Sequence, residues 1–227
     1  MIGVYDYTVL LTYLGFASGV AGIANLLNGG SVFTSVICLM FAGLCDMFDG
    51  KVARTKKKRT TEEKHFGIQL DSLSDLVCFG VLPASIGFVL CKNPESVKAA
   101  SYLIKPLVVL FPLAGLIRLA WFNVLEITRN SNTPVKEYTG LPITSSALIC
   151  PFVFIFKNLL GKYFALTYCL VLLVVGLLFI IKIKIKKPGI KTMILFIIIG
   201  VIEILLIMTV RRILWYTYLG IEIVMKI

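Results

Sequence analysis

Long apolar runs separated by short polar segments dominate the chain. Residues 7–45 include no charged residue. As a single helix this stretch would extend roughly 58 Å, about twice the thickness of the hydrocarbon core of a bilayer. We therefore expect it to turn at Asn28-Gly29-Gly30-Ser31, a sequence typical of a tight connection. The pattern predicts two membrane-spanning helices before the first charged cluster.

Further apolar runs continue to the end of the chain. The predicted spans lie near residues 5–27, 32–52, 68–90, 106–125, 141–156, 163–181, 192–210 and 213–225, the last being the shortest. Pro106 is expected to begin the fourth span and Pro112 to kink it. The sequence thus predicts an all-α integral membrane protein, a polytopic bundle of about eight transmembrane helices, with residues 1–227 forming a single transmembrane domain.

The composition agrees with the hydropathy pattern. Hydrophobic residues make up 58% of the 227 residues and charged residues 15%, and the mean hydropathy is +0.93. Since soluble domains carry roughly 25% charged residues, a soluble fold is excluded, as are a disordered chain and a disulfide scaffold. The six cysteines lie in or beside apolar runs without CxxC spacing. We therefore expect them to pack as small apolar side chains rather than to ligate zinc.

Positive charge is concentrated in three connections. The chain has 23 Lys and Arg against 12 Asp and Glu, and the basic residues gather at residues 51–64, 128–139 and 182–191. With eight spans these connections fall on one side together with both termini, and the positive-inside rule places that side in the cytoplasm. Attraction to anionic membrane lipids explains the net charge of +11 without a nucleic-acid partner.

Aspartates are clustered at two helix ends. Asp46 and Asp49 lie near the end of the second predicted span, and Asp71 and Asp75 near the start of the third. The spacings of three and four residues put each pair on one helix face. Carboxylates at membrane depth are costly and repel one another, and either protonation or bound divalent cations would relieve these penalties. Oxygen ligands alone favour Mg²⁺, Mn²⁺ or Ca²⁺ over zinc.

Small residues and a cation accompany the two pairs. Gly50 and Gly67 flank them, and Ala53 and Arg54 follow Gly50 by about one turn. Glycine in a helix indicates close approach of a ligand or, alternatively, of another helix. An arginine beside carboxylates that hold metal ions suits a diphosphate that contacts both. Asp46 precedes Lys51 by five residues, about 8 Å along a helix, so we expect the site near headgroup level.

Together these residues resemble the signature of the CDP-alcohol phosphotransferase family. The matching pattern is Asp46-x2-Asp49-Gly50-x2-Ala53-Arg54 followed by Gly67-x3-Asp71-x3-Asp75, with a longer interval between Arg54 and Gly67 than is usual. Members are integral membrane transferases with a six-helix core, which move a substituted phosphate from a CDP-linked alcohol to a hydroxyl and release CMP. Residues 66–76, 79–84, 118–123 and 140–143 resemble the phosphatidylserine synthases of this family. The resemblance covers residues 7–156 and leaves 157–227 as additional C-terminal spans.

The resemblance implies a metal-assisted mechanism for phospholipid biosynthesis. Two divalent ions, Mg²⁺ or Mn²⁺ with Ca²⁺ as a further candidate, would be held by Asp46, Asp49, Asp71 and Asp75. CDP-diacylglycerol or CDP-archaeol would be bound by Asp46, Gly50, Ala53, Arg54, Gly67 and Asp71. Asp75 would act as general base for the hydroxyl of L-serine. A homodimer and an active site at the cytoplasmic face of the membrane are further implications.

Two polar residues of the fourth predicted span are candidates for the acceptor. Arg118 and Asn123 would bind the serine carboxylate or a phosphate, although Arg118 pairing with a motif aspartate is an equal alternative. A sister enzyme that uses glycerol 3-phosphate or inositol phosphate would need more arginines near the site. A divalent-cation transporter is the alternative of another class, but it leaves the small residues unexplained, and Arg54 would repel the permeating ion.

Overall fold

The computed structural model describes residues 3–127, 137–186 and 190–224, and these are almost entirely helical. The helices are α1 (Leu10–Leu27), α2 (Val32–Ala53), α3 (Thr61–Asp75), the π-helical η1 (Leu76–Val81), α4 (Leu82–Cys91), α5 (Lys98–Ile127), the 3-10 helix η2 (Ile143–Ser145), α6 (Ser146–Ile155), α7 (Lys157–Leu160), the 3-10 helix η3 (Gly161–Tyr163), α8 (Phe164–Ile180) and α9 (Ile190–Val224). Two short strands, β1 (Glu137–Thr139) and β2 (Lys184–Lys186), pair antiparallel.

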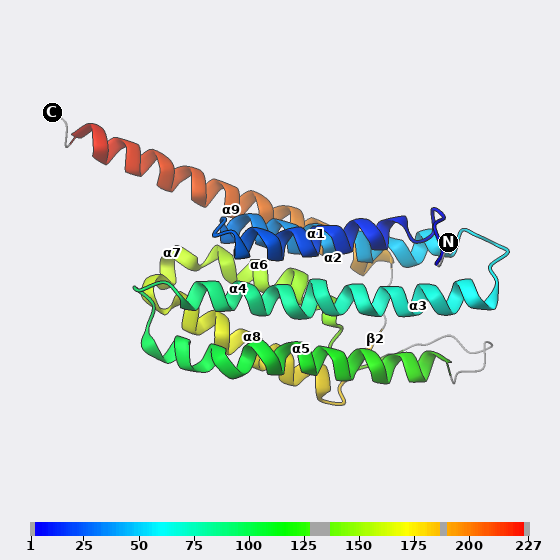
Figure 1. Ribbon diagram of the computed structural model, residues 1–227. Coiled ribbons are helices and arrows are strands. Elements are labelled where there is room, and N and C mark those ends of the chain that lie inside the picture. Colours follow the sequence, from blue (N-terminus) through cyan, green and yellow to red (C-terminus); the bar gives the residue numbers. More distant parts are fainter. Residues whose placement is uncertain (1–2, 128–136, 187–189, 225–227) are drawn as a thin grey trace.

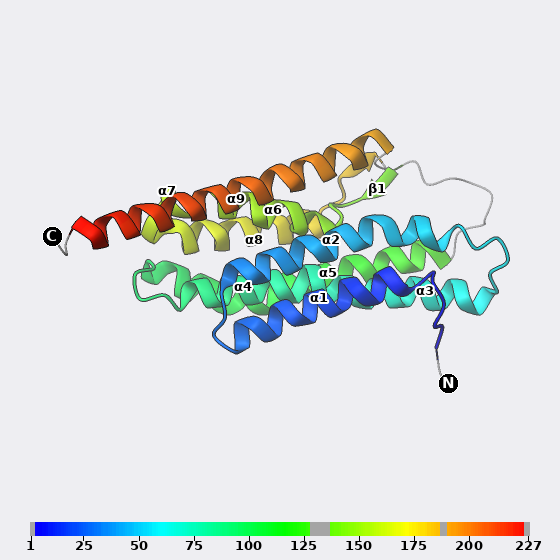
Figure 2. The ribbon, with the colours of Figure 1, turned by 90° about the horizontal axis from the view of Figure 1, so that it is seen from above.

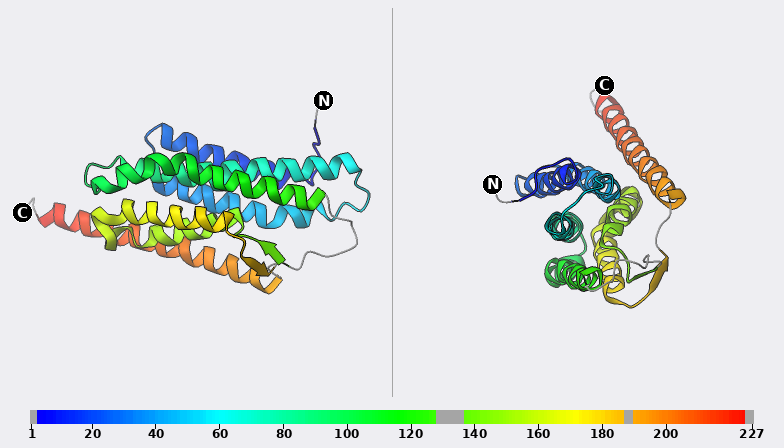
Figure 3. Two further views of the ribbon diagram at one scale, coloured as in Figure 1. Left: turned by 90° about the horizontal axis from the view of Figure 1, so that it is seen from below. Right: turned by 90° about the vertical axis from the view of Figure 1, so that its right-hand side faces the viewer.

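The long helices lie side by side in one elongated bundle (Figures 1 and 2). α3, η1 and α4 follow one another without a break and form a single rod, because residues 61–91 are helical throughout. α1 packs against α2, and α5 against α8. In the end-on view, α9 lies on the side of the bundle away from α3 (Figure 3).

The expected class, a polytopic helical membrane protein, is confirmed. Within the described residues, six helices are long and apolar enough to cross a membrane, and Ile143–Ile155 is a shorter apolar helix. The rod of residues 61–91 contains the third predicted span and extends it by about two turns at its beginning. That extension begins at Thr60, whose hydroxyl accepts a 3.1 Å hydrogen bond from the backbone of Glu63 in a capping box.

The prediction of eight separate spans is wrong, because the predicted seventh and eighth spans form one helix. α9 continues from Ile190 to Val224, because Arg211 and Arg212 are good helix formers and no proline interrupts the segment. The chain therefore crosses the bundle once less than expected. The N-terminal end of the chain and the C-terminal end of α9 lie at opposite ends of the bundle, not on one side (Figure 1).

The fourth and fifth predicted spans also have different bounds. α5 begins at Lys98, so Pro106 lies inside the helix with Pro112 instead of starting it. Within a membrane, a proline inside a helix is tolerated because neighbouring groups compensate the missing backbone hydrogen bond. The fifth span is shorter than predicted, because residues preceding Ser146 form a short 3-10 turn after Pro142.

Small residues let α1 approach the helices that carry the aspartates. A methyl group added to Gly15 would lie 3.1 Å from Cβ of Cys45 on α2, and one added to Gly19 would lie 2.5 Å from Sγ of Cys78 on η1. Such close contact is typical of helices packing in lipid, where small side chains bring backbones together. These contacts hold α1 directly against α2, which carries Asp46 and Asp49, and against η1, which follows Asp75.

Candidate active site

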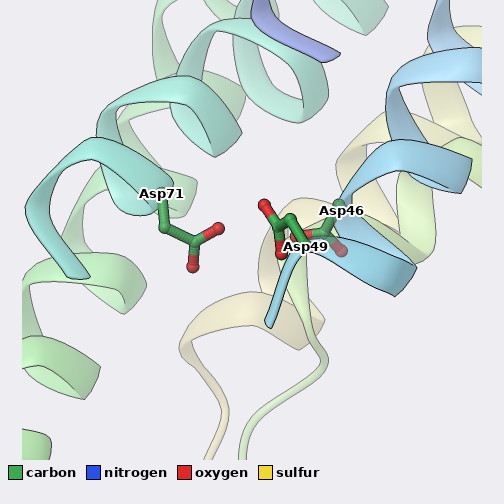
Figure 4. A group of neighbouring side chains, drawn as sticks. All are labelled: Asp46, Asp49 and Asp71. Carbon is green, nitrogen blue, oxygen red and sulfur yellow. The ribbon is translucent and has the colours of Figure 1, made fainter. Parts of the chain in front are cut away.

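Three carboxylates from two helices converge near one end of the bundle. Asp46 and Asp49 of α2 and Asp71 of α3 each offer an oxygen, and these oxygens all lie within 4.8 Å of one another. Figure 4 shows Asp71 reaching from its helix toward the pair on α2. The three side chains therefore meet between α2 and α3.

Asp75 completes the acidic lining of the same site. It lines one small cavity together with the three converging aspartates, one turn of α3 beyond Asp71. Asp75 is 8% exposed and Asp49 is 7% exposed, whereas Asp46 and Asp71 are partly accessible. Asp75 is thus placed in the cavity but not in the converging trio.

The helix changes its winding directly after Asp75. The next six residues form the π-helix η1, and the hydroxyl of Ser146 on α6 donates a 2.9 Å hydrogen bond to the carbonyl oxygen of Phe79 within it. A π-helical turn is rare and occurs frequently at functional sites. Here the π-helical turn follows α3, which carries Asp71 and Asp75, and its hydrogen bond from Ser146 links it to α6.

One functional contact was missed by the sequence analysis. The hydroxyl of Thr12 on α1 donates a buried 2.8 Å hydrogen bond to Oδ2 of Asp49. Such a bond fixes the orientation of the carboxylate, as outer partners of metal ligands do. The available signal was that Thr12 lies three residues before Gly15, on the side of α1 that packs closely against α2.

The small residues of the motif lie beside the carboxylates toward the helix ends. Gly50 is exposed, and a methyl group added there would lie 3.8 Å from Nη2 of Arg54, which is also exposed. Gly67 is one turn before Asp71, and its added methyl would lie 2.9 Å from Nη2 of Arg59. Each glycine of the motif therefore has an arginine beside it, and only Arg54 belongs to the predicted motif.

The two candidate residues on α5 have different surroundings. Asn123 accepts a 2.9 Å hydrogen bond through Oδ1 from the hydroxyl of Ser72, the residue after Asp71. Arg118 lies 5.9 Å from the ring centroid of Phe122, and its charge is near enough to attract Asp46. α5 is thus tied to α3 at the level of the site.

The donor set fits hard divalent cations. Each of the three converging groups is a carboxylate, and the thiol of Cys78, which also lines the cavity, donates to the carbonyl oxygen of Gly15 instead. Carboxylate oxygens are the ligands that Mg²⁺, Mn²⁺ and Ca²⁺ prefer. Asp46, Asp49 and Asp71 could therefore hold such an ion.

Fold and site together define a polytopic helical membrane protein with a carboxylate-rich cavity near one end of its bundle. Comparison of the sequence with known families identifies the particular class. Residues 8–181 match the CDP-alcohol phosphatidyltransferase family, and the chain belongs to it. The family is generally dependent on divalent metal ions, in agreement with the aspartate trio.

Three relatives illustrate the similarity. An archaetidylserine synthase of Methanothermobacter thermautotrophicus is 33% identical, with 77% of this chain and 67% of the relative covered. A CDP-diacylglycerol–serine O-phosphatidyltransferase of Methanocaldococcus jannaschii is 35% identical, with coverage of 82% and 75%. The enzyme of the same name from Saccharomyces cerevisiae is 35% identical, with coverage of 57% and 51%.

The family match extends further than the resemblance seen in the sequence. It ends at residue 181 rather than 156, so it includes α8, which was assigned to the additional C-terminal spans. α8 contains no charged residue, which explains why no motif revealed its membership. Of the long helices, α9 alone lies beyond the matched residues.

Proposed function

We propose that this protein transfers the phosphatidyl or archaetidyl group of a CDP-linked lipid to the hydroxyl of L-serine and releases CMP. The convergence of three carboxylates inside a membrane bundle is the observation that carries the reaction class. The names of the relatives, which include both phosphatidyl- and archaetidylserine synthases, support serine as the acceptor. The proposal leaves the lipid chains of the donor open, because both kinds of relative are similar.

Asp46, Asp49 and Asp71 would hold the divalent ions, with Asp75 as a fourth ligand to a pair of Mg²⁺ or Mn²⁺ ions. When bound, such ions neutralise the diphosphate and stabilise the charge that develops in an in-line displacement. Thr12 keeps the Asp49 carboxylate oriented through its hydrogen bond. The cost of burying four carboxylates in one membrane cavity supports this assignment, because the unbound cluster would repel itself.

Asp75 is the proposed general base. It lies in the same cavity as the trio but one turn deeper, where a serine hydroxyl beside the diphosphate would be within reach. In the reaction the serine oxygen forms a bond to the lipid-linked phosphorus, the bond from that phosphorus to the CMP oxygen breaks, and the hydroxyl proton passes to the Asp75 carboxylate. The negative charge that develops on the CMP oxygen leaves with CMP.

The substrates would lie on opposite sides of Asp71. Gly50, Ala53 and Gly67 are the small residues that would face the cytidine end of the donor, and Arg54 would contribute a cation to its phosphates. Arg118 and Asn123 on α5 are the proposed ligands of the serine carboxylate and amino group. The hydrogen bond from Ser72 to Asn123 supports this placement, since it sets Asn123 beside Asp71.

The proposed site faces the cytoplasm. The end of α2, the beginning of α3, the end of α5 and both strands lie at one end of the bundle (Figure 1). These segments flank the three basic connections, so the positive-inside rule orients that end inward. Serine would enter from the aqueous side while the donor chains stay in lipid. A homodimer remains a prediction from the family resemblance.

An acceptor panel tests the function. Purified protein with Mn²⁺ and CDP-diacylglycerol is offered L-serine, glycerol 3-phosphate or inositol phosphate, and CMP release is measured. We expect CMP release with serine as the only acceptor. A phosphorylated acceptor needs cations of its own, and residues 3–125 contain only three arginines, Arg54, Arg59 and Arg118. Release with a phosphorylated acceptor would identify a sister enzyme. Mn²⁺ flux into proteoliposomes without CMP release would identify a transporter.

A further inference from the structure

A second arginine lies beside Gly67 of the motif. Arg59 belongs to the connection between α2 and α3, in the interval that is longer than is usual in the family. Its Nη2 would be 2.9 Å from a methyl group added to Gly67. The guanidinium therefore fills the space that the absent side chain of Gly67 leaves, and a nucleotide lying against Gly67 must contact or displace it.

The guanidinium is held loosely by its own chain. Nη1 donates a 3.5 Å hydrogen bond to the carbonyl oxygen of Ala53, and Nη2 donates a 3.3 Å bond to that of Glu63. Both are longer than the usual 2.9–3.0 Å or so. Nε is buried and has no hydrogen-bond partner among the described residues. Donors are thus available for a stronger acceptor.

The connection that presents Arg59 is itself anchored. Lys56 forms ion pairs of 2.7 Å with Asp6 and 2.8 Å with Glu63, which tie it to both the N-terminal segment and α3. The hydrogen bond from Lys56, with a further one from Thr8, lowers the pKa of Asp6 to about 2. The depressed pKa keeps Asp6 ionised below pH 4, and the contribution of the pair to stability is lost as the pH falls from about 4 to about 2. Arg59 then leads directly into the cap residue Thr60.

We infer that Arg59 binds the nucleoside-linked phosphate of the donor diphosphate, which leaves in CMP, and that it is a determinant of affinity for the CDP-linked donor. This inference rests on the proposed function. Gly67 lies about 6 Å along α3 from Asp71, so a diphosphate at the carboxylates would place its nucleoside end beside Arg59.

Guanidinium chemistry favours this role over that of the neighbouring lysines. A guanidinium presents a planar set of donors that matches two phosphate oxygens, whereas an ammonium is a point charge. Lys57 and Lys58 precede Arg59 directly but are exposed. The connection therefore offers a matched control, because Lys58→Gln removes one positive charge from the same segment without touching Gly67.

Nucleotide binding and turnover by the full-length protein in detergent test the inference. Calorimetry with CMP and with cytidine, in Mn²⁺, is combined with KM values for CDP-diacylglycerol and serine. We expect Arg59→Gln to raise the Kd of CMP and the KM of the CDP-lipid by about tenfold, as for loss of one charge-assisted contact. Cytidine affinity and the KM of serine should not change. Lys58→Gln should behave as the wild type.

The outcomes separate this inference from the proposed function. Equal CMP affinity in Arg59→Gln and Lys58→Gln, or a raised KM for serine, would overturn the role of Arg59. Arg59→Lys should retain part of the CMP affinity and provides the test if the glutamine variant is unstable on heating. A wild-type protein that binds CMP yet releases none with serine would instead reject the acceptor, while the CMP titrations still decide on Arg59.

Discussion

The rod formed by α3, η1 and α4 and the helix α9 are both apolar helices that carry a carboxylate at membrane depth. In the rod, 61% of the most apolar window is buried inside the bundle, whereas in α9 the corresponding value is 11%. Their acidic residues are nevertheless similarly buried, since Asp75 is 8% exposed and Glu203 is 3% exposed. Burial of an acid alone therefore does not distinguish the two helices.

The surroundings of the two carboxylates do distinguish them. Asp75 shares a cavity with three further aspartates, two of which belong to α2. Glu203 is buried on α9, and its Oε2 finds no hydrogen-bond partner among the described residues. Several converging oxygens can share a divalent cation, while one buried carboxylate cannot form such a site. The comparison teaches that convergence of ligands from two helices, rather than depth in the membrane, marks the functional acids.

Removing a member of the trio should break the site most completely. Asp71→Asn keeps the shape of the side chain but removes its charge, so metal affinity should fall by more than the ~100-fold that loss of an outer partner can cost. Initial rates of CMP release at increasing Mn²⁺ and the thermal stabilisation by Mn²⁺ measure this. Wild-type stabilisation by Mn²⁺ in the variant would contradict the assignment of Asp71.

Asp75 should affect chemistry more than binding. Asp75→Asn is expected to lower kcat by about 10²–10⁴-fold, the usual contribution of a general base, while CDP-lipid binding stays measurable. Single-turnover CMP release and calorimetry with CMP separate the two effects. Normal turnover in this variant would reject the base assignment and leave Asp75 as a lining residue.

Loss of the partner on α1 should have an intermediate effect. Thr12→Val removes the hydroxyl that donates to Asp49 and keeps the branched shape, so half-maximal activity should need about tenfold more Mn²⁺. Thr12→Ser retains a hydroxyl and serves as the control. Equal metal requirements in the valine and serine variants would show that the hydrogen bond does not orient the ligand.

The acid of α9 should matter least. Glu203→Gln is expected to leave CMP release and its Mn²⁺ dependence unchanged, and to leave thermal stability equal or higher, because an amide is less costly than a carboxylate in a membrane protein interior. A melting curve and an activity assay suffice. A loss of activity comparable to that of Asp71→Asn would mean that the comparison between the two helices is wrong.

Much of the fold was predictable because hydropathy reports directly on length and environment. The charge-free run of residues 7–45 had to turn, and α1 and α2 are separated at residues 28–31 as expected. The prediction failed where charged residues were read as the boundary between two spans. Arg211 and Arg212 suggested an end to the seventh span, yet α9 passes through them, because charged residues with high helix propensity do not terminate a helix.

The candidate site was predictable to the extent that it follows helical periodicity. Spacings of three and four residues place Asp46 with Asp49 and Asp71 with Asp75, and the trio meets across α2 and α3. Thr12 and Arg59 were not predictable in the same way. Thr12 depends on how closely α1 approaches α2, and Arg59 on the path of an irregular connection, and neither is periodic in the sequence.

The sequence by itself determined that this chain resides in a membrane, that its acids lie on two helix faces, and that their chemistry suits hard cations. These properties follow from composition and from the pitch of the α-helix, which are local. Only the tertiary structure decided which oxygens converge, that Asp75 lines the same cavity as the trio, and that Arg59 closes the space beside Gly67. Those relations arise from packing between segments distant along the chain, where distances of a few ångströms are set by neighbouring helices.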